Sequence, residues 1–336
     1  MVRRTPVDPM KVRPMTNLAK STTEIVIRDQ FPYWQAALHR DVPNLSAGTI
    51  VLTGCGTSFF LAQSLACAYN SIGQRAIAVP GAEWAQRPGA YLANTDDILV
   101  IGLSRSGTTT ETVQALRASR ARGWATFAIS CEKGSAILAA ADQSLYLPTH
   151  PDEGIVMTVS ACLMLLGGSR LVGIPLSDAV ITAGQTSLAQ MEVAVRQIIS
   201  GRSHFVYLGA GANYGIATEG CLKLQEMSLS YSQSFHPMEY RHGPISLIDA
   251  NSVVTILYSD DTGPDEAKVA AEVMAKGARV IGINGPGDLR IDLGVTGLSA
   301  TLATLPALQI MGEYVALQKG INTEMPRHLT KVVVLA

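Results

Sequence analysis

The sequence has 336 residues, which is enough for two domains of ordinary size. It is 47% hydrophobic and 16% charged, as is typical of a compact protein with well-buried sheets. The net charge of −1 argues against a nucleic-acid or membrane-surface partner. Five widely spaced cysteines lack metal-ligand spacing, so we expect free thiols in a reducing cytoplasm and neither a metal nor a cofactor.

The first residues are basic and rich in proline, without the apolar segment of a secretory signal. We expect a flexible tail over residues 1–15. Ser21 and Glu24 then form a capping box, which predicts one or two helices within residues 16–45, broken near Pro32. The apolar segment from Ile155 to Gly168 is too short to span a bilayer, so we expect a helix of the core.

Apolar runs of strand length alternate with helical patterns, which predicts βαβ units and a mainly parallel sheet. We expect a first α/β domain over residues 46–185 and a linking helix over residues 186–200. A second domain then fills residues 201–336. The expected strands are Thr49–Gly54, Ala76–Val79, Ile98–Leu103, Thr126–Ser130, Gln143–Pro148, His204–Gly209, Ser252–Ser259 and Arg279–Asn284.

The two halves carry matching landmarks at nearly constant spacing. Gly54 and Gly209 are 155 positions apart, Ser104 and Ser259 are also 155 apart, and the pair Cys131 and Asn284 is 153 apart. This constancy indicates a duplicated domain. The alternative is a coincidence of ordinary βαβ spacing.

The first half has a polar turn, Ser104-Arg-Ser-Gly-Thr-Thr109, between a strand and a helical pattern. A helix N-terminus and hydroxyl groups hold anions well, and Gly107 allows the backbone to approach a phosphate closely. The sequence therefore predicts a phosphate site, with an ordinary cluster of helix-capping residues as the alternative. The second half has Asp260 and Asp261 in the matching turn, so we expect only the first copy to bind the anion.

A second group of polar residues lies in the second half. Glu219, Lys223 and Glu226 have the spacing of one helical face, which would also suit a solvated ladder of salt bridges. A rigid polar loop with two histidines follows, ending at His242-Gly-Pro244, where a structural role for each histidine is the alternative. The C-terminal segment carries Lys331 in a strand-like apolar run, where it could also protect an edge strand from pairing.

Several motifs stand in the order found in the sugar isomerase (SIS) family. The sequence resembles this family in its tandem form, as in the isomerase half of glutamine–fructose-6-phosphate aminotransferase, from about residue 20 to its end. The resemblance implies two flavodoxin-like three-layer domains and a 6-phosphosugar ligand. The motifs are Gly54-Cys-Gly-Thr-Ser58, Ser104-Arg-Ser-Gly-Thr-Thr109, Glu219-Gly-Cys-Leu-Lys223-Leu-Gln-Glu226, His242-Gly-Pro244 and Pro326-Arg-His-Leu-Thr-Lys331.

The resemblance also implies roles for individual residues. Glu226 matches the catalytic acid/base and His242 the ring-opening histidine. Glu219 and Lys223 match the family's sugar-facing glutamate and lysine. Lys331 matches the lysine of its C-terminal tail. The phosphate loop matches Ser104, Arg105, Ser106 and Thr109, although the family usually has Gln where Arg105 stands. The sugar-binding turn matches Cys55, Gly56, Thr57 and Ser58, and a looser match gives Thr158.

These residue types suit an aldose–ketose isomerisation. A glutamate can move a proton between C1 and C2, a histidine can open the ring, and a lysine can stabilise the enediolate or form an imine. We expect a 6-phosphosugar isomerase that acts on an amino-sugar phosphate and releases ammonia. The alternative activity is that of a deglycase of a phosphosugar–amine conjugate. Glutamine-dependent synthesis is not expected, since no glutaminase domain or N-terminal Cys is present.

Two other classes of protein remain as alternatives. A non-catalytic sugar-phosphate sensor would also use such a fold, although no helix-turn-helix or basic patch is present. A dinucleotide-binding dehydrogenase would need a glycine fingerprint that Gly209 and Gly211 match only in part. The resemblance further implies a homodimer, in which the histidine loop reaches the site of the neighbouring subunit.

Overall fold

The computed structural model describes residues 20–93 and 97–332. The tail expected over residues 1–15 lies outside these ranges, as does most of the apolar C-terminal run. The helices are α1 (Thr22–Arg28), α2 (Phe31–Leu38), α3 (Thr57–Ser71), α4 (Gly81–Gln86), η1 (Pro88–Ala90), α5 (Thr110–Ala121), α6 (Ala136–Ala140), α7 (Val159–Arg170), α8 (Ala179–Ile199), α9 (Ala212–Ser228), α10 (Pro237–Tyr240), η2 (Pro244–Leu247), α11 (Gly263–Ala275) and α12 (Gly297–Gln318).

Within the described ranges, ten strands form two parallel sheets of five strands each. The order is β2-β1-β3-β4-β5 in the first sheet and β7-β6-β8-β9-β10 in the second. Because these orders correspond strand by strand, the flavodoxin-like duplication is confirmed. The strands are β1 (Thr49–Gly54), β2 (Ala76–Pro80), β3 (Ile98–Ser104), β4 (Ala125–Ser130), β5 (Gln143–Tyr146), β6 (His204–Gly209), β7 (Ser232–Phe235), β8 (Ser252–Leu257), β9 (Arg279–Ile283) and β10 (Leu289–Ile291).

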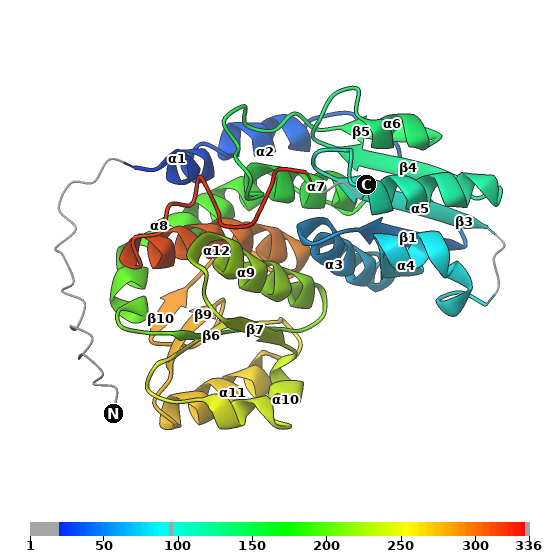
Figure 1. Ribbon diagram of the computed structural model, residues 1–336. Helices are drawn as coiled ribbons and strands as arrows, with labels where there is room; N and C mark the ends of the chain where they lie inside the picture. The colour runs from blue at the N-terminus through cyan, green and yellow to red at the C-terminus, as the bar shows by residue number, and fades with distance from the viewer. Residues whose placement is uncertain (1–19, 94–96, 333–336) are drawn as a thin grey trace, which may run out of the picture.

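The helices form three layers around the two sheets (Figure 1). A shared layer of α3, α7, α8, α9 and α12 lies between the sheets, and its apolar side chains join the inner faces of both sheets in one continuous core. On the outer face of the first sheet lie α4, α5 and α6. On the outer face of the second sheet lie α10 and α11.

The two copies begin their first helix in the same way. Gly56 (φ +54°, ψ −128°) precedes α3, and Gly211 (φ +56°, ψ −131°) precedes α9. A residue with a Cβ atom would be strained at these dihedral angles, which glycine adopts readily. The duplication therefore extends to the backbone conformation of the turns that precede α3 and α9.

The N-terminal helices follow the predicted break. The Ser21 hydroxyl accepts a hydrogen bond from the Glu24 amide at 2.9 Å, which caps α1. The chain then turns at Asp29 and Gln30, and Pro32 stands in the first turn of α2, where proline is tolerated.

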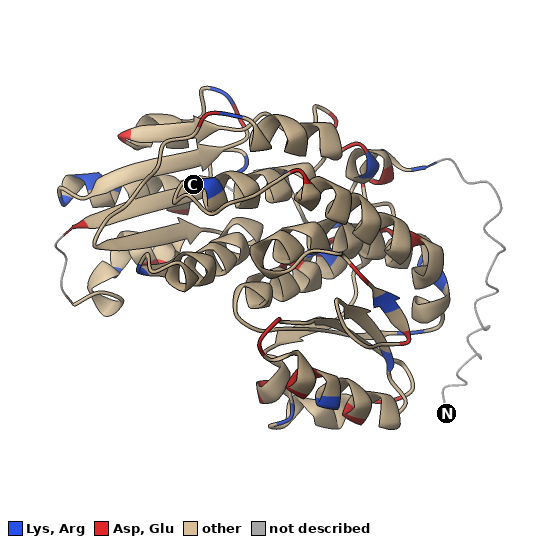
Figure 2. Ribbon diagram, turned by 180° about the vertical axis from the view of Figure 1, so that it is seen from behind, with Lys and Arg blue, Asp and Glu red and all other residues tan. Residues whose placement is uncertain are grey.

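None of the helices within the described ranges has the length and apolar character needed to cross a membrane. In the view from behind, acidic and basic segments are interspersed over both halves (Figure 2).

Candidate functional site

The phosphate loop closes on itself through its hydroxyl groups. Ser104 Oγ accepts a hydrogen bond from the Gly107 amide at 3.1 Å and lies 3.1 Å from Thr109 Oγ1. Ser106 Oγ accepts a hydrogen bond from the Thr108 amide at 3.3 Å. The loop therefore leads from the end of β3 into the N-terminus of α5 in the compact form expected of an anion-binding turn.

Gly107 is required in this loop for two reasons. Its φ of +63° lies in the left-handed region. A Cβ atom there would also lie 2.0 Å from Ser135 Oγ and 2.8 Å from Ser130 Oγ. The loop backbone consequently packs directly against hydroxyl groups at the end of β4 and just after it.

The acid/base residues lie on one face of α9, as their spacing predicts. Lys223 Nζ donates to Glu226 Oε2 and lies 3.4 Å from Glu219 Oε1. The side chains of Glu219 and Lys223 are both 1% exposed, and that of Glu226 is 21% exposed. A solvated ladder of salt bridges is excluded by this burial. Lys223 is held between two carboxylates, and only Glu226 reaches toward solvent.

Burial perturbs the protonation of this group. Desolvation raises the pKa of Glu219 to about 7, although the Lys223 charge opposes the rise. Burial also acts to lower the pKa of Lys223, but the two carboxylates outweigh it and the pKa is raised. Within the described residues, Glu219 Oε2 has no hydrogen-bond partner. Lys223 therefore remains an ammonium at neutral pH, while Glu219 is close to its titration point.

The sugar-binding turn predicted at Cys55–Ser58 reaches the acid/base helix. Thr57 Oγ1 donates a hydrogen bond to Glu219 Oε1 at 3.1 Å, which joins the first domain to the second. Gly215 allows this approach, since a Cβ atom at that position would lie 2.3 Å from the Phe60 carbonyl oxygen. Cys55 Sγ lies 3.8 Å from Thr112 Oγ1, so the turn also borders the helix that follows the phosphate loop.

The guanidinium of Arg105 has carbonyl partners outside the phosphate loop. Nη1 donates to the Gly154 oxygen and Nη2 to the Lys331 oxygen, each at 3.0 Å. Burial lowers the pKa of Arg105, and the charges of Glu153 and Glu226 offset part of that lowering. Arg105 therefore joins the phosphate loop to the segment before α7 and to the C-terminal tail.

Glu153 organises the segment before α7 and was not predicted from the sequence. Its carboxylate accepts hydrogen bonds from Thr149 Oγ1 at 2.9 Å, the Thr158 amide at 2.7 Å and the Ser160 amide at 3.0 Å. Its backbone oxygen accepts from Lys331 Nζ at 3.0 Å. Thr158 itself donates its hydroxyl to Glu153 at 3.1 Å and is 1% exposed. The acidic pair Asp152-Glu153, just before the apolar run that begins at Ile155, was the signal available in the sequence.

His242 is not brought to this cluster within one chain. It follows α10, which packs on the outer face of the second sheet, whereas α9 covers the inner face. It is exposed and lines a hollow of about 520 Å³ with Arg241, Glu272 and Lys276. Within one chain, Glu219, Lys223 and Glu226 therefore lie together beside the sugar-binding turn, and His242 lies on the other side of the second sheet.

The matching turn of the second copy has a different arrangement. The Ser259 amide donates to the buried carboxylate of Glu266 at 2.8 Å, and Asp260 accepts from the Gly297 amide at 2.9 Å. In the second copy, carboxylates therefore accept hydrogen bonds from backbone amides. The corresponding loop of the first copy offers hydroxyl groups instead. That only the first copy binds an anion remains a prediction.

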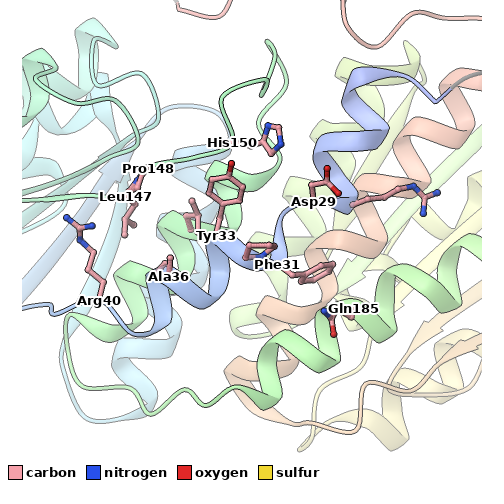
Figure 3. Close-up of a pocket in the computed structure, with 13 residues that line it drawn as sticks. Asp29, Phe31, Tyr33, Ala36, Arg40, Leu147, Pro148, His150 and Gln185 are labelled. Carbon is pink, nitrogen blue, oxygen red and sulfur yellow. The ribbon is translucent and has the colours of Figure 1, made fainter.

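A cavity of about 770 Å³ lies away from these residues, between α2, the segment after β5 and α8 (Figure 3). Tyr33 and His150 both line it and lie next to each other, with ring centroids 5.4 Å apart. None of the predicted site residues lines it. The candidate site is therefore separate from the lining of this cavity.

Comparison with known proteins identifies the class to which this fold and this cluster belong. The SIS domain family matches residues 45–167 and 198–288. The chain belongs to the SIS domain family, with one SIS segment in each half.

Individual relatives have related names. The chain is 32% identical over 270 residues to glutamine–fructose-6-phosphate aminotransferase [isomerizing] of Corynebacterium efficiens, covering 70% of this chain and 43% of the relative. A relative with the same name from Pyrobaculum aerophilum is 28% identical over 86% of this chain and 52% of its own length. The chain thus spans about half the length of the curated relatives it matches.

Solved structures resemble the chain over almost its whole length. Glucosamine-6-phosphate deaminase from Thermotoga maritima has a TM-score of 0.83 and 28% identity, with 94% of this chain and 100% of that chain covered. Tagatose-6-phosphate ketose/aldose isomerase from Escherichia coli has a TM-score of 0.77 at 22% identity, with 90% and 95% covered. At that identity the second likeness concerns the fold alone.

Proposed function

We propose that the chain is a 6-phosphosugar aldose–ketose isomerase that acts on a 2-amino sugar phosphate and releases ammonia. The observation that carries the proposal is a chain of side-chain contacts. The turn at Cys55–Ser58 contacts Glu219 of the acid/base helix and Thr112 of the helix after the phosphate loop. Arg105 of that loop in turn donates to the tail at Lys331. The overall likeness to a glucosamine-6-phosphate deaminase supports the amino-sugar version.

In this proposal the sugar phosphate binds at the hydroxyl groups of Ser104, Ser106 and Thr109 and the N-terminus of α5. Anchoring the phosphate allows its binding energy to orient C1 and C2. One side of the sugar is bordered by the turn of Cys55, Gly56, Thr57 and Ser58. Thr158 binds Glu153, whose backbone oxygen accepts a hydrogen bond from Lys331.

The chemistry then divides among few side chains. His242 promotes ring opening, and Glu226 takes the proton from C2 and returns it to C1. The C2–N bond becomes an iminium, which water hydrolyses to the ketose and ammonium. Lys223 holds Glu226 in place and offsets its charge, while Lys331 provides a positive charge for the developing oxygen.

The product test uses a panel of 6-phosphosugars with and without a 2-amino group. We expect the amino sugars to give ketose and ammonia in equal amounts, measured together by an enzymatic ammonia assay and NMR. Ketose formation only from sugars without nitrogen would replace the deaminase with a plain isomerase. Release of a bound amine other than ammonia would indicate a deglycase, and binding without any turnover would indicate a sensor.

Because His242 lies on the outer face of the second sheet, the proposal includes a homodimer in which each site receives His242 of the second copy. Chains with Glu226→Gln and chains with His242→Ala are inactive alone in this scheme. Mixed after dissociation, half of the dimers hold one intact site, so about a quarter of the wild-type activity returns. No recovery from a verified mixed dimer would place the histidine and the glutamate of one site in the same chain.

A further inference from the structure

Three segments distant in sequence meet at the guanidinium of Arg105. Arg105 follows β3 in the phosphate loop and is 8% exposed. One terminal nitrogen donates to the Gly154 oxygen before α7, and the other donates to the Lys331 oxygen in the C-terminal tail, each at 3.0 Å. A planar guanidinium can bridge two acceptors in this way, whereas a single ammonium group presents its donors from one point.

The side chain of Lys331 completes the connection in the opposite direction. Its Nζ donates to the Glu153 oxygen at 3.0 Å. The loop at Glu153 and Gly154 accepts one bond from Lys331 and one from Arg105. It is itself fixed, because Glu153 is 2% exposed and its carboxylate accepts hydrogen bonds from the Thr158 and Ser160 amides. The tail is therefore held at Lys331 by one bond to its backbone and one from its side chain.

Loss of the bond from Arg105 to the Lys331 backbone would have a different effect on the tail from loss of the bond made by the Lys331 side chain. Between the end of α12 at Gln318 and residue 332 the described chain has no helix or strand, so its position depends on such contacts. Among the described residues, the Lys331 ammonium has the neutral Glu153 carbonyl oxygen as its hydrogen-bond acceptor, and Lys331 is an exposed residue. It can exchange that acceptor for a sugar oxygen, provided that the backbone stays in place.

We propose that Arg105 is a positioning residue that keeps the backbone of the C-terminal tail on the site, so that Lys331 can turn to the substrate without release of the tail. Arg105 accordingly acts through Lys331 and not as a ligand of the phosphate. The role of Lys331 rests on the proposed function, whereas the attachment of the tail does not.

The attachment is tested by limited proteolysis of the full chain. Arg327 and Lys331 are exposed trypsin sites in the tail. Arg105→Gln removes both bonds, and Arg105→Lys keeps the charge without the fork. We expect cleavage after Arg327 and Lys331, followed by intact mass, to be on the order of tenfold faster in both variants. Arg120→Gln removes a guanidinium that pairs with the half-exposed Asp142 in the same domain, and should leave the rate unchanged.

A second measurement separates tail positioning from phosphate binding. Binding of inorganic phosphate, measured by calorimetry, should be the same in Arg105→Gln as in the wild type. In turnover assays, the double variant Arg105→Gln/Lys331→Ala should have the kcat of Lys331→Ala alone, since the arginine acts through the lysine. Additive losses in kcat would contradict this.

Unchanged tail cleavage in both Arg105 variants overturns the proposal, and a weaker affinity for phosphate with unchanged cleavage makes Arg105 a phosphate ligand. Because cleavage and phosphate binding require no turnover, they decide the matter even if no phosphosugar is converted. Turnover with unchanged cleavage would leave the proposed function intact and remove only the tail attachment.

Discussion

Replacing Glu219 by Gln should change how the stability of the protein depends on pH. The wild-type carboxyl is fully buried, and burial raises its pKa from 4.5 to about 7. Between these values the folded protein keeps a proton that the unfolded chain has lost. Since the folded state binds more protons there, the free energy of unfolding falls as pH rises, and it falls most steeply between pH 4.5 and 7.

The size of the effect follows from the shift. Each pKa unit corresponds to about 1.4 kcal/mol, so the wild type should lose roughly 3 kcal/mol over this window relative to the variant. The amide of Glu219→Gln keeps the hydrogen bond from Thr57 available but does not titrate. Subtracting the two pH profiles cancels the contributions of histidines and other common groups.

The measurement is urea denaturation of both proteins at half-unit steps from pH 4.5 to 8. We expect the free energy of unfolding of the wild type, minus that of Glu219→Gln, to fall as the pH rises toward 7 and to stay constant above it. A difference that does not depend on pH, or one that rises with pH, would refute the reasoning, because Glu219 would then be ionised throughout and stabilised by Lys223.

Three further substitutions test other parts of the structure. Ser106→Ala should weaken binding of a 6-phosphosugar about tenfold with an unchanged melting temperature, and equal KM values would mean that the phosphate loop is misassigned. Gly107→Ala should lower the free energy of unfolding by about 2 kcal/mol or more in urea denaturation, because Gly107 has a positive φ and packs against Ser135. A variant as stable as the wild type would contradict this packing. Gly215→Ala should cost about 1–3 kcal/mol by parting α3 from α9, whereas Gly89→Ala, in open space, should cost far less.

Much of the fold followed from the sequence because its strands are short, apolar and bounded by polar turns. The repeat of landmarks at about 155 positions predicted two corresponding sheets, and their strand orders agree. Helix α12 was not predicted. It contains Pro306, and nearly all of its residues are buried, so it lacks the one-sided apolar period by which a surface helix is recognised.

The candidate site was predictable only in part. The spacing of Glu219, Lys223 and Glu226 indicated one helical face, but not whether water or the first domain covers it. The hydrogen bond from Thr57 depends on the packing of the two domains. Arg105 binds backbone oxygens of the tail and of the segment before α7, and Glu153 binds the Thr158 and Ser160 amides. Side-chain patterns do not reveal such backbone partners.

The central claim is that Glu226 moves a proton between C1 and C2 of a bound 6-phosphosugar. The direct test is exchange of the C2 hydrogen in D₂O, followed by NMR for the wild type and Glu226→Gln. We expect exchange to fall by at least about a hundredfold in the variant, with binding of the same sugar phosphate preserved in calorimetry. Undiminished exchange in Glu226→Gln would contradict the account.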